Sequence, residues 1–318
     1  MLVNRGLGKS GAMKTAYILQ IHKNPHQVNQ FIKQLISAEY ADIFIHIDKK
    51  HYETIKDEII KDPRVYVLKQ SICCEWGDIS QIDATLLLLR EVVGMNQSYD
   101  YVCLRSGQDL LVKEGFKEFL RNSSQNIYMT VNKMEKKHLD SMLINWPKIT
   151  RGRYDSIHPI RVYRAIVRGL YRLGVIVSPN DNQLPDNFSY YSGSQWFTIP
   201  FEVAKFIIQF LDKNEWYYQF FKNTLVPDQW FFQTLLMNSP YHKNIVNNNL
   251  MYLEWGDTIS TRNSPKIIRM KDAELVEKSN HFFARKFDEN VDPVVVDYFT
   301  SRITFSHLKN DKSISKIN

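Results

Sequence analysis

The spacing of apolar residues changes repeatedly along the first third of the chain. Short apolar runs that end in polar residues occur at 16–21, 42–47, 64–67 and 99–104, and this pattern predicts buried strands. Between the runs, apolar residues recur at helical spacing, first over 28–36 and again over 79–93. Alternating strands and helices predict an α/β fold with a Rossmann-like, mainly parallel central sheet and helices on both faces.

Polar residues follow three of these strands. His22 comes after the first strand, Asp48 after the second and Asp109 after the fourth. Ligands of such sheets bind beyond the carboxyl ends of the strands, so we expect the three side chains to meet at one crevice.

A second group of elements follows from residue 190 onward. Residues 190–200 are strand-like, and 202–211 have helical spacing. Pro227 suits the first position of a further helix whose apolar face continues through Phe231 and Leu235. Asp228 would then lie in the first turn, where the helix dipole favours an ionised carboxylate that could bind or deprotonate a sugar hydroxyl. An ordinary charge-complementing helix start is the alternative.

The chain predicts one domain over 13–308 with an embedded insertion at about 133–187. The insertion is rich in Arg and Tyr, which is compatible with an acceptor-side surface, a nucleic-acid surface or a solvated helix face. Residues 1–12 contain a Gly-Lys-Ser sequence that lacks the spacing of a phosphate loop, and we interpret them as a disordered leader or a cloning remnant. Residues 309–318 are predicted to be a disordered tail.

Composition and charge restrict the class of protein, its location and the ligands that it could bind. The 318 residues are 44% hydrophobic and 24% charged, without an apolar run near twenty residues or a signal peptide, so we expect a cytoplasmic protein. The three cysteines match no zinc or disulfide framework. The net charge of +7 attracts anions, which could be a phosphorylated small molecule, nucleic acid or the inner face of an anionic membrane as a peripheral contact.

Basic residues near the end of the domain suggest how a diphosphate leaving group could be held. No Asp-x-Asp pair follows a strand, so the usual carboxylate site for a divalent cation is missing from the sequence. Arg285 and Lys286 lie among phenylalanines, and Arg262 and Lys266 lie upstream. These cations could form a preorganised clamp in place of a metal, although each could equally belong to a plain surface.

Six short motifs occur in one order along the chain. They are Ile45-His46-Ile47-Asp48-Lys49-Lys50, Trp76-Gly77 ahead of Ala84-Thr85-Leu86, Ser106-Gly107-Gln108-Asp109, Gly193-Ser194-Gln195-Trp196, Pro227-Asp228-Gln229 with Phe232-Gln233-Thr234, and Phe283-Ala284-Arg285-Lys286-Phe287-Asp288. In this combination the chain resembles the core-2/I-branching glycosyltransferases (family 14), which include β-1,6-N-acetylglucosaminyltransferases, peptide xylosyltransferases and bacterial members. The resemblance extends from 16 to about 292, and we take the chain for a bacterial member.

The resemblance implies a GT-A fold and an inverting, metal-independent transfer from a UDP-sugar, with N-acetylglucosamine favoured, to a glycan, polysaccharide or lipid-linked acceptor. No metal cofactor and no nucleic-acid partner are expected. By the same resemblance, the predicted donor-binding residues are His22, Asp48, Asp109, Arg262, Lys266, Arg285 and Lys286. The predicted acceptor-binding residues are Gly193, Ser194, Gln195, Trp196 and Trp255.

One departure from the family pattern concerns the catalytic base, the residue that takes the proton of the acceptor hydroxyl. Relatives carry Glu where this chain has Gln229, and a neutral amide does not accept the acceptor's proton usefully. Asp228 is the first choice for the base, and Glu254 or Glu75 are alternatives. The other interpretation is a catalytically silent homologue that binds sugar nucleotides or glycans.

Overall fold

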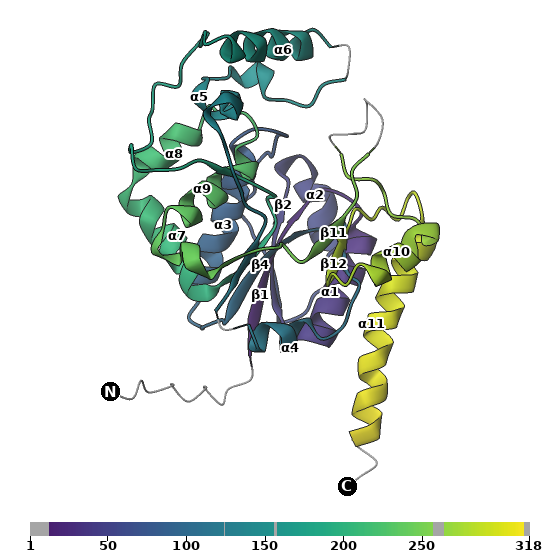
Figure 1. The fold of residues 1–318 in the computed structure, drawn as a ribbon. Helices are drawn as coiled ribbons and strands as arrows, with labels where there is room; N and C mark the ends of the chain where they lie inside the picture. Colours follow the sequence, from purple (N-terminus) through teal and green to yellow (C-terminus); the bar gives the residue numbers. More distant parts are fainter. Residues whose placement is uncertain (1–12, 124, 156–157, 257–263, 315–318) are drawn as a thin grey trace, which may run out of the picture.

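The computed structural model describes residues 13–123, 125–155, 158–256 and 264–314, with side chains as far as Ile303. A seven-stranded sheet in the order β10-β6-β9-β4-β1-β2-β3 forms its centre (Figure 1). The strands are β1 (Thr15–Ile21), β2 (Asp42–Ile47), β3 (Val65–Val67), β4 (Tyr101–Ser106), β6 (Ile127–Met129), β9 (Phe197–Pro200) and β10 (Ile245–Asn247). Among these strands only β9 runs antiparallel to its neighbours, which confirms the predicted mainly parallel α/β sheet.

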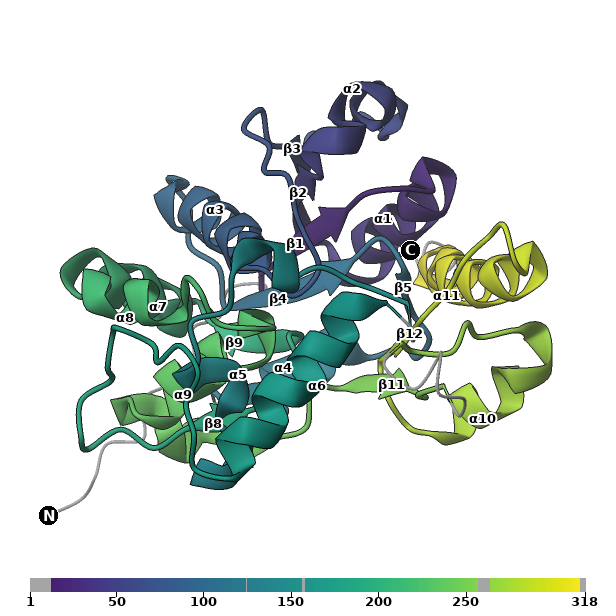
Figure 2. The ribbon, with the colours of Figure 1, turned by 90° about the horizontal axis from the view of Figure 1, so that it is seen from above.

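Helices cover both faces of this sheet (Figure 2). On one side α1 (Pro25–Glu39) lies beside α11 (Pro293–Ile314), and on the other α3 (Ser80–Gly94) lies beside α7 (Phe201–Lys213). The central strands β2 and β4 are buried along their whole length, because helices cover both of their faces. This is why they read as short continuous apolar runs instead of alternating ones.

A small second sheet, in the order β11-β12-β5, lies beside the first. It joins β5 (Asp109–Leu111), β11 (Met251–Leu253) and β12 (Phe283–Arg285). β5 and β12 are antiparallel, and their register sets Asp109 opposite Arg285. Two predicted site residues that are far apart in sequence thereby become neighbours.

The predicted insertion contains α5 (Asp140–Leu143) and α6 (Pro159–Arg172), and it begins and ends beside the short pair β7 (Asn132–Lys133) and β8 (Tyr191–Ser192). Figure 1 shows α6 at the end of the molecule opposite the C-terminal part of α11. A separate small core of Ile144, Trp146, Val167 and Leu225 holds α6 to the rest of the fold. The remaining helices are α2 (Tyr52–Ile55), α4 (Phe116–Arg121), α8 (Glu215–Phe221), α9 (Phe231–Met237) and α10 (Ala273–Lys278).

Three sequence predictions need correction or qualification. The segment 190–200 is not one strand, because the chain leaves β8 after Ser192 and enters β9 at Phe197. Pro227 begins a 3-10 turn, and the α-helix starts only at Phe231. Residues 309–314 continue α11 as helix where a disordered tail was predicted, while 315–318 and the predicted leader 1–12 lie outside the described residues.

Candidate active site

Asp48 lies where β2 ends, next to the end of β1. Its backbone N–H donates to the carbonyl of Ile21 over 2.8 Å. Its buried carboxylate accepts from the backbone N–H groups of Lys50 (2.8 Å) and Cys74 (2.9 Å). Both carboxylate oxygens therefore hold the backbone of the loops at this edge by hydrogen bonds. The Asp48 side chain is better placed to support the loops around a ligand than to contact the ligand directly.

His22 and Lys286 come together at the same edge from opposite ends of the chain. Desolvation lowers the pKa of His22, and the positive charges of Lys23 and Lys286 lower it further. Burial, the largest effect, and then Arg285, Lys23 and Arg153 lower the pKa of Lys286. Lys23 is neutralised by Asp288 at 2.5 Å, whereas Lys286 makes no ion pair within the described part of the chain. An anion bound here would relieve the repulsion among these cations.

Asp109 and Arg285 form a buried ion pair below this cation cluster. Asp109 Oδ1 lies 3.2 Å from Arg285 Nη1, and the two oxygens of Asp109 also accept hydrogen bonds from the backbone and hydroxyl of Ser106. The Arg285 guanidinium stacks 4.2 Å from the ring centre of Trp196, which is itself buried. Within the described structure, the Nε and Nη1 atoms of Arg285 are buried without a hydrogen-bond partner, although Nη1 takes part in the ion pair with Asp109. Arg285 thus joins Asp109 to Trp196 in the interior of the site.

Sequence reasoning missed Arg105 as a part of this site. Arg105 is fully buried in β4 and donates to the carbonyls of Leu104 (2.7 Å) and Phe197 (3.0 Å). Its guanidinium lies 4.2 Å from the centre of the Phe283 ring, so this phenylalanine of the Arg285–Lys286 motif packs against Arg105. A single charge directly after the apolar run 99–104 was the available signal.

The predicted residues Lys266 and Trp255 lie on a loop that leaves the second sheet. Lys266 Nζ is 2.6 Å from Glu254, so this lysine and one alternative base neutralise each other. Trp255 bridges to Pro265 and is 53% exposed, as a stacking surface for a sugar must be. Arg153 of the insertion hydrogen-bonds to Ser264 of the same loop. Arg262 lies outside the described residues.

The predicted acceptor floor is tightly built around Gly193. Its N–H donates to the carbonyl of Gln229 over 2.8 Å, and a Cβ at this position would fall 1.8 Å from the carbonyl oxygen of Thr130. The carbonyl of Ser194 accepts from Gln233 (2.6 Å), and the amide of Gln195 reaches Gln20 at the end of β1 (2.9 Å). The floor is therefore tied both to the Pro227–Gln229 turn and to the central sheet.

Asp228 differs from the prediction in its electrostatics. The left-handed Val226 (φ 52°) leads into the 3-10 turn, so no α-helix dipole acts on the carboxylate through a first turn. Burial raises the pKa of Asp228 to about 6, and its own backbone N–H offsets part of this effect. The Oδ1 atom has no partner among the described residues. The prediction that the dipole of an α-helix stabilises the Asp228 carboxylate is therefore wrong, and a carboxylate with a raised pKa is a stronger base than an ordinary one.

Gln229 contributes its backbone to the structure of the turn. Its N–H donates to the carbonyl of Val226 (3.1 Å), and its own carbonyl accepts from Gly193. The other alternative base, Glu75, begins the segment before α3, where its backbone N–H donates to the hydroxyl of Ser80. Two residues further on, the carbonyl of Gly77 accepts a hydrogen bond from the N–H of Val226 (3.0 Å), so the segment that carries Glu75 lies against the start of the turn.

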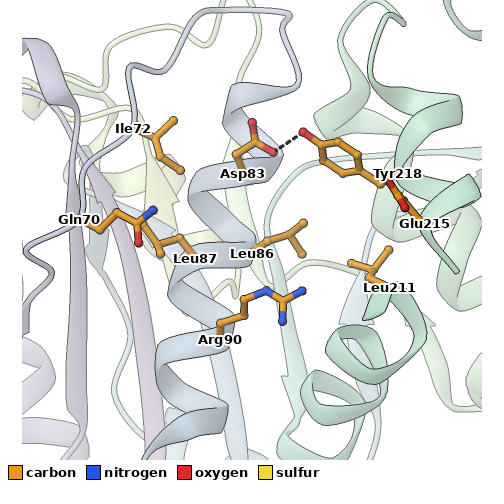
Figure 3. Close-up of a pocket in the computed structure, with 9 residues that line it drawn as sticks. All are labelled: Gln70, Ile72, Asp83, Leu86, Leu87, Arg90, Leu211, Glu215 and Tyr218. Carbon is orange, nitrogen blue, oxygen red and sulfur yellow. Dashed lines mark hydrogen bonds between the residues drawn. The ribbon is translucent and has the colours of Figure 1, made fainter. Parts of the chain in front are cut away.

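A shallow groove of about 370 Å³ lies away from these residues (Figure 3). It runs between α3 and the α7–α8 segment, where the Asp83 carboxylate accepts a 2.9 Å hydrogen bond from Tyr218. Its walls are Gln70, Ile72, Leu86, Leu87, Arg90, Leu211 and Glu215. None of the predicted site residues lines it.

The described residues contain neither a metal-binding cluster nor a helix that could span a membrane. No three or more His, Cys, Asp or Glu side chains in this part of the chain are grouped so that they could hold a metal ion. No described helix is both long and apolar enough to cross a bilayer. The predicted metal independence stays a prediction.

Similarity to known proteins extends over most of the chain. The Core-2/I-Branching enzyme family model matches residues 15–278. Xylosyltransferase 2 of Canis lupus familiaris is 25% identical over 313 residues, covering 90% of this chain and 33% of that protein. A xylosyltransferase of Ciona intestinalis is 21% identical over 92% of this chain and 34% of its own length. The chain thus spans about a third of these relatives, both of them animal proteins, and its bacterial origin stays a prediction.

Among solved structures, the apo form of the bifunctional glycosyltransferase WbbM aligns with 95% of this chain and 52% of its own. The sequence identity is 12% and the TM-score is 0.41.

Proposed function

Because the chain belongs to the Core-2/I-branching enzyme family, we propose that it is a GT-A glycosyltransferase that transfers a sugar from a UDP-sugar to an acceptor hydroxyl with inversion and without a metal ion. N-Acetylglucosamine is the first donor sugar to consider, and xylose is the second because the relatives are named xylosyltransferases. The acceptor is a glycan, a polysaccharide or a lipid-linked saccharide.

The observation that carries this proposal is the state of Lys286. It is half-buried, makes no ion pair with another described residue, and is surrounded by Lys23, Arg285 and Arg153, so that its pKa is lowered. A cation held in this way gains stability when a polyanion arrives. The diphosphate of a UDP-sugar supplies that charge, and the lysine then stabilises the UDP that leaves.

The reaction we propose is one displacement at the anomeric carbon. The acceptor oxygen forms a bond to that carbon as the bond to the β-phosphate oxygen breaks. The electron pair of the broken bond stays on UDP next to Lys286, and the acceptor proton passes to Asp228. The raised pKa of Asp228 suits this role, and the exposed Trp255 provides an apolar surface for a sugar, while the buried Trp196 packs against Arg285.

Gln229 motivates a second candidate function. If Asp228 does not reach the acceptor hydroxyl, the protein binds sugar nucleotides or glycans without turning them over. In that case Gln229→Glu would create turnover, whereas Asp228→Asn would change nothing measurable in transfer.

Calorimetry with UDP in the presence of EDTA tests the donor site. We expect binding without a divalent ion, and a loss of about tenfold or more in affinity for Lys286→Gln, since a charge-assisted hydrogen bond contributes about 1.5–3 kcal/mol. Lys213→Gln, an exposed lysine at the end of α7, is the matched control. Binding that appears only with Mn²⁺, or an unchanged affinity in Lys286→Gln, would contradict the proposal.

Product analysis after incubation with UDP-N-acetylglucosamine, UDP-xylose, UDP-glucose and UDP-galactose identifies the donor sugar. We expect one of the four to be consumed in preference.

A further inference from the structure

The outer face of α6 carries exposed apolar side chains. Val162, Ile166 and Leu173 follow one another at the spacing of a single helix face and are 53%, 58% and 81% exposed. The apolar residues Val175, Ile176 and Val177 come directly after and are also exposed. In the view from above, α6 lies in front of the other elements (Figure 2). Such a patch on an outermost helix indicates an interaction surface.

The opposite face of α6 is firmly attached. Val167 and the partly buried Tyr171 pack in the small core with Trp146 and Leu225. Arg164 donates to the carbonyls of Thr150 (2.5 Å) and Gly152 (2.6 Å). The inner face of the helix therefore holds it against the rest of the fold, and the apolar side chains of its outer face do not contribute to the core.

The apolar segment is tied to the end of this helix. Gly174 adopts a left-handed conformation (φ 86°), and the N–H of Val175 returns to the carbonyl of Leu170 over 2.9 Å. The chain then pairs with 144–145 through Pro179 and Ser178. Residues 173–177 thus stay beside α6 and extend its outer face.

The charge of this region has one sign. No acidic residue occurs between Asp155 and Asp181, whereas α6 contains four arginines. Arg168 pairs with Asp140 (2.8 Å) and Arg164 is buried, while Arg161 and Arg172 form no ion pair with any residue that the structure describes. An apolar face flanked by unpaired arginines is the pattern of a helix that lies in a membrane interface and attracts anionic headgroups.

We propose that α6, together with residues 173–177, docks this protein on an anionic lipid bilayer. The apolar side chains enter the interface, and Arg161 and Arg172 contact lipid phosphates. A protein partner of ordinary composition would present no comparable uniform negative charge to the two arginines. A second copy of the chain would bring the same positive charge to the interface.

The docked face is joined to the acceptor side of the candidate site. Leu225, in the small core under α6, is followed by Val226 and then by the Pro227–Gln229 turn that carries Asp228. Together with the proposed function, this geometry favours an acceptor that is itself held at the membrane surface. That consequence rests on the proposed function, whereas docking itself does not.

Vesicle flotation with the full chain tests the proposal. We expect binding to phosphatidylcholine vesicles with about 30% phosphatidylglycerol and much weaker binding to phosphatidylcholine alone. Ile166→Glu should weaken binding about tenfold. The double variant Arg161→Gln with Arg172→Gln should weaken it about fivefold per charge. The matched controls are Leu275→Glu, an exposed leucine of α10, and Lys213→Gln, and both should bind like the parent.

Three results would overturn the proposal. The first is no binding of the parent to anionic vesicles, and the second is equal binding of the parent and Ile166→Glu. The third is a concentration-dependent dimer, measured by light scattering, that Ile166→Glu abolishes, since the face would then be occupied by a second copy. UDP calorimetry on the same preparations separates failure of docking from failure of the donor site, because no residue of α6 belongs to that site.

Discussion

Asp228→Asn is expected to make the protein more stable at pH 8 while stopping sugar transfer. Burial raises the pKa of Asp228 from its ordinary value of 3.8 to about 6, so the folded protein binds a proton there more tightly than the unfolded chain does. The stability from this proton is complete below about pH 4, falls as the pH rises from about 4 to about 6, and is absent above that window.

The magnitude follows from this shift. At about 1.4 kcal/mol per pKa unit, the ionised Asp228 lowers the free energy of unfolding by at most about 3 kcal/mol at pH 8 and by about 1 kcal/mol at pH 4.5. Asn has nearly the same shape and carries no charge to desolvate. Asp228→Asn should therefore gain up to about 3 kcal/mol at pH 8 and clearly less at pH 4.5, and lose transfer by about 10²- to 10⁴-fold.

Urea denaturation followed by tryptophan fluorescence measures the first effect, and product formation from the UDP-sugar measures the second. Asp181→Asn, at an exposed position, is the control and should change stability by less than about 0.5 kcal/mol. The reasoning fails if Asp228→Asn is less stable than the parent at pH 8, or if its advantage is the same at both pH values. Retained transfer would remove Asp228 as the base.

Three further outcomes are expected. Gly193→Ala should lose about 3 kcal/mol of unfolding free energy by urea denaturation, because its Cβ would overlap the Thr130 carbonyl, and a loss below about 0.5 kcal/mol would mean that the contact relaxes easily. Arg151→Met should lose about 3–5 kcal/mol in the same measurement, because it leaves the buried Asp78 carboxylate, 2.9 Å away, without its cation. The control Arg90→Met, in the exposed pair with Asp212, should lose less than about 1 kcal/mol. Equal losses in the two variants would contradict the argument. Trp255→Ala should leave the melting temperature unchanged and raise the KM for the acceptor about tenfold in steady-state kinetics, and a rise in the KM for the donor instead would place Trp255 on the wrong substrate.

The sheet could be predicted because its strands are buried on both faces. In β2 and β4 this produces short apolar runs, and the polar residues that follow mark the carboxyl edge correctly. The 190–200 segment misled the prediction, because Gly193 to Trp196 have strand-like neighbours yet leave the ladder to form the acceptor floor. A tertiary contact, the close approach of Gly193 to Thr130, decides that geometry.

The candidate site was only partly accessible from sequence. Motif order identified Asp109, Arg285 and Trp196, and the structure brings these three into one stack. The roles of Arg105 and Lys23 could not be inferred from sequence. Arg105 packs against Phe283, and Lys23 forms an ion pair with Asp288, and in both cases the fold brings together residues that are far apart in the chain. Pro227 was predicted to begin an α-helix, but it begins a 3-10 turn that follows the left-handed Val226, and the α-helix starts at Phe231. The pKa of Asp228 is raised by burial, which the sequence pattern did not reveal.

The small core beneath α6 separates two kinds of sequence change. Val167 and Leu225 fix the distance between the helix and the turn that carries Asp228, so substitutions there disturb chemistry and attachment together. Val162 and Ile166 face outward, so they can vary without altering that distance. One side of this single helix can therefore change what the protein docks on, while the other side keeps the turn that carries Asp228 in its position.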